Sequence, residues 1–137
     1  MNLATETITV FNRAHDPETD SDVWAGTVIH NVSWYCHVRD TVTDRGLKAA
    51  NEYTIRIPLE AVAENNRTYV FPNEYNTAND ASHFWTVAPG DVIVKGKAET
   101  VGQTPVTLKH AYKMCTVLGV TDNRRAPNAP HLRIVGG

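Results

Sequence analysis

Apolar and polar residues alternate along the chain with a period of two, most clearly between Val28 and Arg39. The even positions of this segment are apolar apart from His30, and the odd positions are mostly polar. Successive side chains of a β-strand point to opposite faces, so the alternation predicts a long strand with one buried face. Ser33, in the middle of the run, predicts a bend or a β-bulge.

Shorter segments carry the same signal, because they are rich in β-branched and aromatic residues and are separated by residues that favour turns. With the long strand, they predict an all-β fold: a small barrel or sandwich of about seven to eight mostly antiparallel strands. Val106–Tyr112 is also predicted to be extended. The other short predicted strands are Thr5–Asn12, Tyr53–Ile57, Tyr69–Phe71, Phe84–Val87, Val92–Lys95, Met114–Val120 and Leu132–Val135.

Helix signals are few, and we expect at most one or two short helices. Pro58–Asn65 could form one, with Pro58 at the first helical position. Asp44–Asn51 could form another, with Asp44 as the N-cap. Neither segment is long enough to be stable without packing against the rest of the fold.

The predicted strands are joined by long polar connections, and no internal repeat or change of composition divides the chain. Its 137 residues suit one core. We therefore expect residues 1–137 to form a single β-barrel-like domain with long polar loops. The principal loops are His15–Asp22, Pro72–Ser82, Lys97–Pro105 and Thr121–Pro130.

The charge balance offers no broad electrostatic surface for nucleic acid or an anionic membrane, since 13 basic and 15 acidic residues give a net charge of −2. No apolar run approaches the roughly 20 residues that span a bilayer. The first residues lack the basic and apolar regions of a signal peptide. The expectation is a protein that neither enters nor crosses a membrane.

No local pattern indicates catalysis or a bound metal. The six histidines lack the spacing of a metal site, and we expect His30 to be a hydrogen-bonded core residue. There is no GxSxG turn and no phosphate-binding loop. Cys36 and Cys115 belong to no CxxC pair. The sequence is compatible with a disulfide between them, but it favours two buried free thiols. We expect no enzyme activity, no cofactor and no small-molecule substrate.

The order of three segments resembles the C-terminal half of small phage head–tail joining proteins, the connectors and stoppers. Pro89–Gly96 reads PGDVIVKG, with a Gly90–Asp91 turn before a strand, and it is followed by KMCTVLGVTDN and HLRIVG. The matching strands would be Thr116–Val120 and Leu132–Ile134. The whole chain, and TDNRRAPNAPH in particular, also resembles a family encoded in Firmicutes prophages near minor capsid genes.

This resemblance implies a virion structural protein at the head–tail junction, a connector, stopper or head-completion subunit that assembles into a ring. Its partners would be further copies of itself, the portal or adaptor, and tail-completion proteins, with packaged DNA nearby. It would be found in the host cytoplasm during assembly and then in the virion. The alternative is a tail-completion or tail-tube component, or another small β-barrel binding module.

Ring formation requires one surface of a subunit to contact a different surface of the next. Such contacts are expected in the loops Thr41–Asn51, Pro72–Ser82 and Thr121–Pro130. Arg124 and Arg125 could pair with the acidic turn Asp16–Asp22 of a neighbour. The candidate interface or channel-lining residues are Asp44, Arg45, Asn73, Glu74, Tyr75, Arg124 and Arg125.

Overall fold

The computed structural model describes residues 5–16, 18, 20–43, 46–59, 61–77, 83–99, 104–125, 127 and 130–137, with the backbone alone for part of the long hairpin. The strands are β1 (Glu6–Asp16), β2 (Ser21–Thr43), β3 (Gly46–Pro58), β4 (Val62–Ala63), β5 (Thr68–Tyr69), β6 (Phe84–Trp85), β7 (Val92–Lys95), β8 (Met114–Asn123) and β9 (His131–Gly136). The helices are α1 (Pro72–Thr77), α2 (Pro105–Ala111) and the 3-10 helix η1 (Glu64–Asn66).

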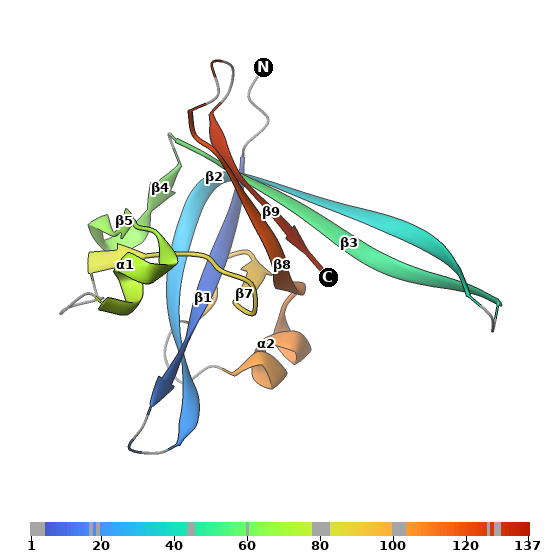
Figure 1. The fold of residues 1–137 in the computed structure, drawn as a ribbon, viewed down its shortest axis with the longest axis horizontal. Helices are drawn as coiled ribbons and strands as arrows, with labels where there is room; N and C mark the ends of the chain where they lie inside the picture. Colours follow the sequence, from blue (N-terminus) through green and yellow to red (C-terminus); the bar gives the residue numbers. More distant parts are fainter. Residues whose placement is uncertain are drawn as a thin grey trace.

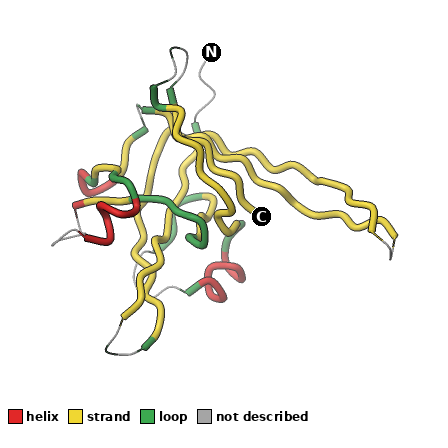
Figure 2. The backbone as a smooth tube through the Cα atoms, in the orientation of Figure 1, coloured by secondary structure: helices red, strands yellow, loops and turns green. Residues whose placement is uncertain are grey.

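Six strands form a closed antiparallel barrel in the order β1-β7-β8-β9-β3-β2, and pairing between β2 and β1 completes the circle. Figure 1 shows the barrel strands crossing near the centre of the molecule, and Figure 2 shows how little helix surrounds them. The predicted all-β fold is confirmed, and it is a barrel. Closure pairs both edges of the sheet within the body of the barrel.

Alternate residues of these strands point inward and form the barrel core, as a period of two requires. Within β2 the inward-facing positions change from odd to even residue numbers. The change occurs where the register shifts from Thr7↔His30 to Glu6↔Val32 and leaves a bulge at Asn31. Asn31 adopts a positive φ of 65°. The buried core residues are Ile8, Val10, Ile29, Val32, Ile55, Ile57, Trp85, Val87, Ile93, Cys115, Val117, Leu132 and Ile134.

The bulge corrects two predictions. It lies at Asn31, two positions before the serine that predicted it, because asparagine tolerates a positive φ better than most residues. Since the parity changes there, Ile29 and Val32 both face the core, and His30 lies on the outer surface. Its side chain is 38% exposed, so His30 is hydrogen-bonded but is not a core residue.

β2 and β3 continue past the barrel as a two-stranded ribbon. β9 pairs with β3 only from Tyr53 onward, so the seven register pairs from His37↔Glu52 to Thr43↔Gly46 join β2 and β3 alone. Strands of that length extend about 24 Å. Figure 1 shows the ribbon projecting to one side of the body. The predicted helix Asp44–Asn51 is therefore wrong, since β3 begins at Gly46; Asp44 itself lies outside the described residues.

The other helix prediction and one loop prediction were also wrong. Pro58 ends β3, and the chain then forms β4 and η1 in place of a helix over Pro58–Asn65. Asn65 breaks helical geometry with a φ of 63°. The predicted loop Pro72–Ser82 instead begins with α1, whose first residue is a proline, the position where a missing N–H matters least.

α2 replaces the extended segment predicted at Val106–Tyr112. Thr104 caps its N-terminus and accepts a hydrogen bond from the backbone N–H of Thr107, in a reciprocal capping box. Leu108 is its buried residue, and it packs with Phe11 on the outer face of the barrel. Within the described part of the chain, no helix is long and apolar enough to cross a membrane.

The Gly90–Asp91 turn connects distant strands. Gly90 has a φ of 95°, which favours glycine. Asp91 is 5% exposed, and its carboxylate accepts hydrogen bonds from Asn12 Nδ2 (3.0 Å), Arg13 N (3.1 Å) and Ala88 N (3.0 Å). Burial raises the pKa of the Asp91 carboxyl, and these hydrogen bonds oppose that rise. The aspartate therefore fixes the end of β1 to the segment before β7.

Both cysteines are free thiols, but only one is buried as expected. Cys115 is 1% exposed in the barrel core, and burial raises its pKa to about 12. Cys36 is exposed, because it lies where β2 leaves the barrel. The expectation that both would be buried was therefore wrong for Cys36.

Gly136→Ala should lower the free energy of unfolding by about 2 kcal/mol, because overpacking forces the surroundings to shift. An added Cβ would lie 2.7 Å from Cys115 Sγ and 3.0 Å from the Thr116 carbonyl oxygen. Urea denaturation of this variant alone and combined with Cys115→Ala checks the contact. Removing Sγ should recover part of the loss; an equal loss in both backgrounds would contradict this packing.

Candidate interaction surface

The turn between β8 and β9 carries an arginine that is held by its own strand. Arg124 Nε and Nη2 donate to the two carboxylate oxygens of Asp122 at 3.0 and 2.9 Å, and the Arg124 backbone N–H also donates to Asp122 Oδ1 at 3.0 Å. Such a two-pronged pair fixes the orientation of the guanidinium plane. These hydrogen bonds lower the pKa of the Asp122 carboxyl and raise that of Arg124.

The same guanidinium lies over two aromatic rings. Its central carbon is 4.7 Å from the ring centre of Tyr69 and 5.3 Å from that of Phe71. Tyr69 also contacts Trp85 edge to face, with ring centres 5.0 Å apart. Stacking of an arginine on aromatic faces is favourable by roughly 0.5–1 kcal/mol at exposed sites. Arg124 thus holds β5 and the residues that follow it against the β8–β9 turn.

Exposed apolar side chains surround this cluster. Leu59 is 57% exposed and Phe71 is 46% exposed. With Asp122, Arg124 and Arg125 they line a shallow cavity of about 250 Å³. Aromatic residues and arginine are enriched at protein interfaces, and here exposed Phe71 lies beside Arg124. We call the surface formed by Leu59, Phe71, Asp122, Arg124 and Arg125 the Arg124 surface.

The structure brings together two of the three loops predicted to form an interface. Arg124 and Arg125 lie in the β8–β9 turn, while Asn73 and Glu74 are exposed on α1, directly after Phe71. Glu74 is close enough for its charge to act on the Tyr69 hydroxyl.

One other candidate, Tyr75, is not part of this surface. Tyr75 is half-buried near Arg67 and Asp91, and burial raises its pKa. Asp44 and Arg45 lie outside the described residues.

Arg124 was also expected to pair with a carboxylate of another subunit, and the structure places its own Asp122 there. Arg125 is exposed and remains a candidate for that contact. Sequence reasoning missed Leu59, Phe71 and Asp122 as parts of the surface, and Tyr69 as the ring beneath Arg124.

Arg124→Ala should lower the free energy of unfolding by about 1 kcal/mol at neutral pH, because it removes the Asp122 pair and the ring stacking together. Arg124→Lys should not restore it, since an ammonium cannot make the two-pronged contact. Arg125→Ala serves as the control and should change stability by less than about 0.5 kcal/mol.

The effect of Arg124→Ala should also depend on pH. Because the folded-state pKa of Asp122 is lowered, the pair stabilises the protein above the unfolded value of 3.8 and is lost as pH falls through the folded value. The difference between wild type and Arg124→Ala in urea denaturation should therefore be smaller at pH 3 than at pH 7. An equal difference at both pH values would contradict the pairing.

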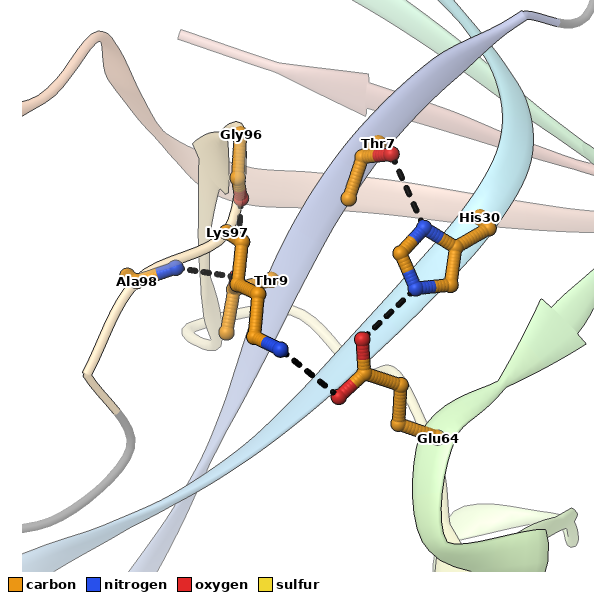
Figure 3. A network of polar contacts seen from close by, with 7 residues as sticks. All are labelled: Thr7, Thr9, His30, Glu64, Gly96, Lys97 and Ala98. Atoms are coloured by element: carbon orange, nitrogen blue, oxygen red, sulfur yellow. Dashed lines mark hydrogen bonds and ion pairs between the residues drawn. The ribbon is translucent and has the colours of Figure 1, made fainter.

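A polar network on the outer barrel surface connects η1 and the segment after β7 to β1 and β2 (Figure 3). His30 Nδ1 lies 3.0 Å from Thr7 Oγ1, and His30 Nε2 lies 2.6 Å from Glu64 Oε2. Lys97 Nζ lies 3.3 Å from the other Glu64 oxygen. Contacts from His30 and then from Lys97 lower the pKa of Glu64.

The hydroxyl, imidazole and carboxylate of this network occur in the reverse order of a hydrolytic triad. In such triads the carboxylate contacts Nδ1 and the hydroxyl contacts Nε2. Here Glu64 faces Nε2 and Thr7 faces Nδ1. We interpret the network as a structural connection between the barrel and its insertions. No group of three or more His, Cys, Asp or Glu suited to a metal ion occurs among the residues that the structure describes.

The fold and this surface define a small closed barrel with a projecting ribbon and an arginine-aromatic contact surface. Residues 3–137 match the family described as "Family of unknown function (DUF6751)", and the chain belongs to this family. Searches of curated proteins and of solved structures gave no match.

Proposed function

We propose that this chain is a structural subunit of the head–tail junction of a phage, a connector, stopper or head-completion protein that assembles into a ring. The observation that carries the proposal is the ribbon of β2 and β3, which leaves a closed barrel and extends about 24 Å from it. A closed barrel supplies a rigid body, and a projecting ribbon supplies reach toward neighbouring subunits.

The ribbon favours contact with another protein for a physical reason. A two-stranded ribbon alone is only marginally stable in water, and its outer edges carry backbone groups available for pairing. Among the described residues, the ribbon part of β2 pairs with β3 and with no other strand. A neighbour that packs on the ribbon would stabilise it and give the subunit a contact beyond its own barrel.

The Arg124 surface supports the same proposal from a second part of the molecule. It lies in the β8–β9 turn and the insertion before α1, whereas the ribbon belongs to β2 and β3. Two different surfaces suit a heterologous contact, in which copies add head to tail until a ring closes. The proposed partners are further copies, the portal or adaptor and tail-completion proteins, with packaged DNA nearby and no enzymatic step.

Affinity capture from a lysate of an induced lysogen, followed by mass spectrometry, tests this function. The tagged chain should recover portal, adaptor or tail-completion proteins. Recovery of tail-tube proteins alone would favour the alternative, a tail component built on the same barrel. Recovery of no virion protein would contradict the proposal.

A shortened variant provides the matched control. Cys36 and Tyr53 are direct register partners, so a two-residue Asn-Gly connection between them replaces the ribbon with a tight hairpin turn. The barrel should keep its circular dichroism spectrum and cooperative unfolding, while capture of the partners is lost. Undiminished capture by a folded shortened variant would remove the ribbon from the proposed function.

A further inference from the structure

A cavity of about 310 Å³ opens at one end of the barrel core, beside the start of the ribbon. It is lined by Trp34, Tyr35, Cys36, Tyr53, Lys95 and Lys113, and we call it the lysine mouth. Trp34 and Tyr53 pack against the barrel core, with ring centres 5.2 Å apart. The volume is at the lower end of the roughly 300–1,000 Å³ of ligand pockets, which often occupy the mouths of barrels.

The strand register places both lysines on the side of the core. Lys95 follows the core residue Ile93 by two positions, and Lys113 precedes the core residue Cys115 by two, so the pleat directs all four to the same face. The Lys95 backbone N–H donates to the Lys113 carbonyl at 2.9 Å, which makes the two residues cross-strand neighbours.

This arrangement puts two like charges side by side in one cavity. Directly opposed like charges destabilise a pair of strands. Neither lysine forms a salt bridge within the described part of the chain. An anionic group bound between them would remove the repulsion, and the three aromatic side chains would supply apolar contact.

The chain itself carries a matching acidic segment at the β1–β2 turn. Glu18 and Asp20 lie in this turn, Asp22 is the second residue of β2, and all three are exposed. Lys95 is level with Ile8, whereas the turn follows Asp16, about 27 Å farther along β1. The turn cannot fold back onto the lysine mouth of its own chain, so a contact between them joins two copies.

We propose that the lysine mouth receives the acidic β1–β2 turn of a second copy of this chain. The contact is heterologous, because mouth and turn are different surfaces separated along the barrel, and it can therefore repeat from copy to copy. This inference rests on the proposed ring assembly and adds a second pair of contacting surfaces to the ribbon and the Arg124 surface. The proposed cationic partners of the acidic turn are thus Lys95 and Lys113. The sequence had suggested Arg124 for this contact, but Arg124 is already paired with Asp122.

Cross-linking through the exposed thiol of Cys36 tests the contact directly. Glu18→Cys and Asp22→Cys place a second thiol on the turn, and a short bismaleimide should join it to Cys36 of another copy in a ladder of dimers and larger species. Lys109→Cys, an exposed position on α2, is the matched control and should give no ladder beyond background. Adding Cys36→Ser should abolish the ladder.

Charge reversal tests the chemistry. Lys95→Glu with Lys113→Glu should lower the ladder yield about tenfold in the Glu18→Cys protein, since two lost charge pairs correspond to roughly 1.4 kcal/mol. Asp20→Lys with Asp22→Lys should have a similar effect. Both reversals in one chain should restore the yield, because every contact then contains one reversed mouth and one reversed turn.

Electron microscopy of the wild type separates this inference from the ring proposal. Rings together with a ladder support both, and a ladder without rings supports the contact while contradicting ring closure. Rings formed by a chain whose turn does not cross-link to Cys36 would overturn the lysine mouth as the interface. Neither rings nor a ladder would contradict both proposals.

Discussion

Asp91→Ala should lower the free energy of unfolding by about 3 kcal/mol. The substitution leaves the backbone N–H groups of Arg13 and Ala88 without the carboxylate that accepts their hydrogen bonds, and it removes one acceptor from Asn12 Nδ2. Each buried polar group left unsatisfied costs about 1–3 kcal/mol, and partial entry of water reduces the total. Urea denaturation measures the loss, with exposed Glu99→Ala as the control that should cost less than about 0.5 kcal/mol.

Asp91→Asn separates the charge of this residue from its shape. Because burial raises the folded-state pKa of Asp91, the Asp91 carboxyl binds its proton more tightly in the folded protein than in the unfolded chain. Its contribution to stability should therefore fall as pH rises from 3.8 through the raised value. The stability of wild type relative to Asp91→Asn should decline over that range. A relative stability that rises with pH would contradict a folded-state pKa raised by burial of the Asp91 carboxyl.

Phe11→Ala should have the largest effect on stability, a loss of about 4 kcal/mol, because it removes a large buried side chain and leaves a cavity. Phe11 is 0% exposed and packs with Val94 and Leu108 in the small cluster between barrel and α2. Leu108 is the buried residue of α2, so the helix depends on this cluster for its attachment. Hydrogen exchange should show its largest increase in α2.

Two variants keep this prediction decisive. Phe11→Leu preserves most of the volume and should cost about 1–1.5 kcal/mol, which allows measurement even where the alanine variant does not fold. Val23→Ala, at a 48% exposed position, should cost less than about 0.5 kcal/mol. A loss below 1 kcal/mol in Phe11→Ala, or unchanged exchange in α2, would contradict the account of this cluster.

The all-β fold was predictable from sequence because the strand signal is local, whereas the choice between barrel and sandwich depends on the pairing of β1 with β2. Alternation and β-branched residues located most strands of the barrel, including β7 and β9 close to their observed bounds. The bulge was predicted at Ser33 instead of Asn31. A shift of one residue exchanges the inward and outward faces of a strand, and only the pairing of β2 with β1 shows at which residue the exchange occurs. The capping box at Thr104 was a readable signal for α2 that the apolar pattern of the segment obscured.

The candidate surfaces were predictable only in part. Arg124 was recognisable as a charged loop residue, but its contacts with Asp122 and Tyr69 depend on how the insertion folds against the β8–β9 turn. Lys95 and Lys113 lie far apart in sequence and gave no local signal. Their shared cavity results from the pairing of β7 with β8, which a composition-based search for basic patches cannot detect.

Labelling of intact virions tests the central proposal most directly. Antibodies against the chain, detected by electron microscopy on phage particles, should mark a single site where the head meets the tail. Particles produced with the chain carrying the Asn-Gly connection in place of its ribbon provide the control and should lack the label. A signal distributed along the tail, or none on particles that contain all their other structural proteins, would contradict a role at the head–tail junction.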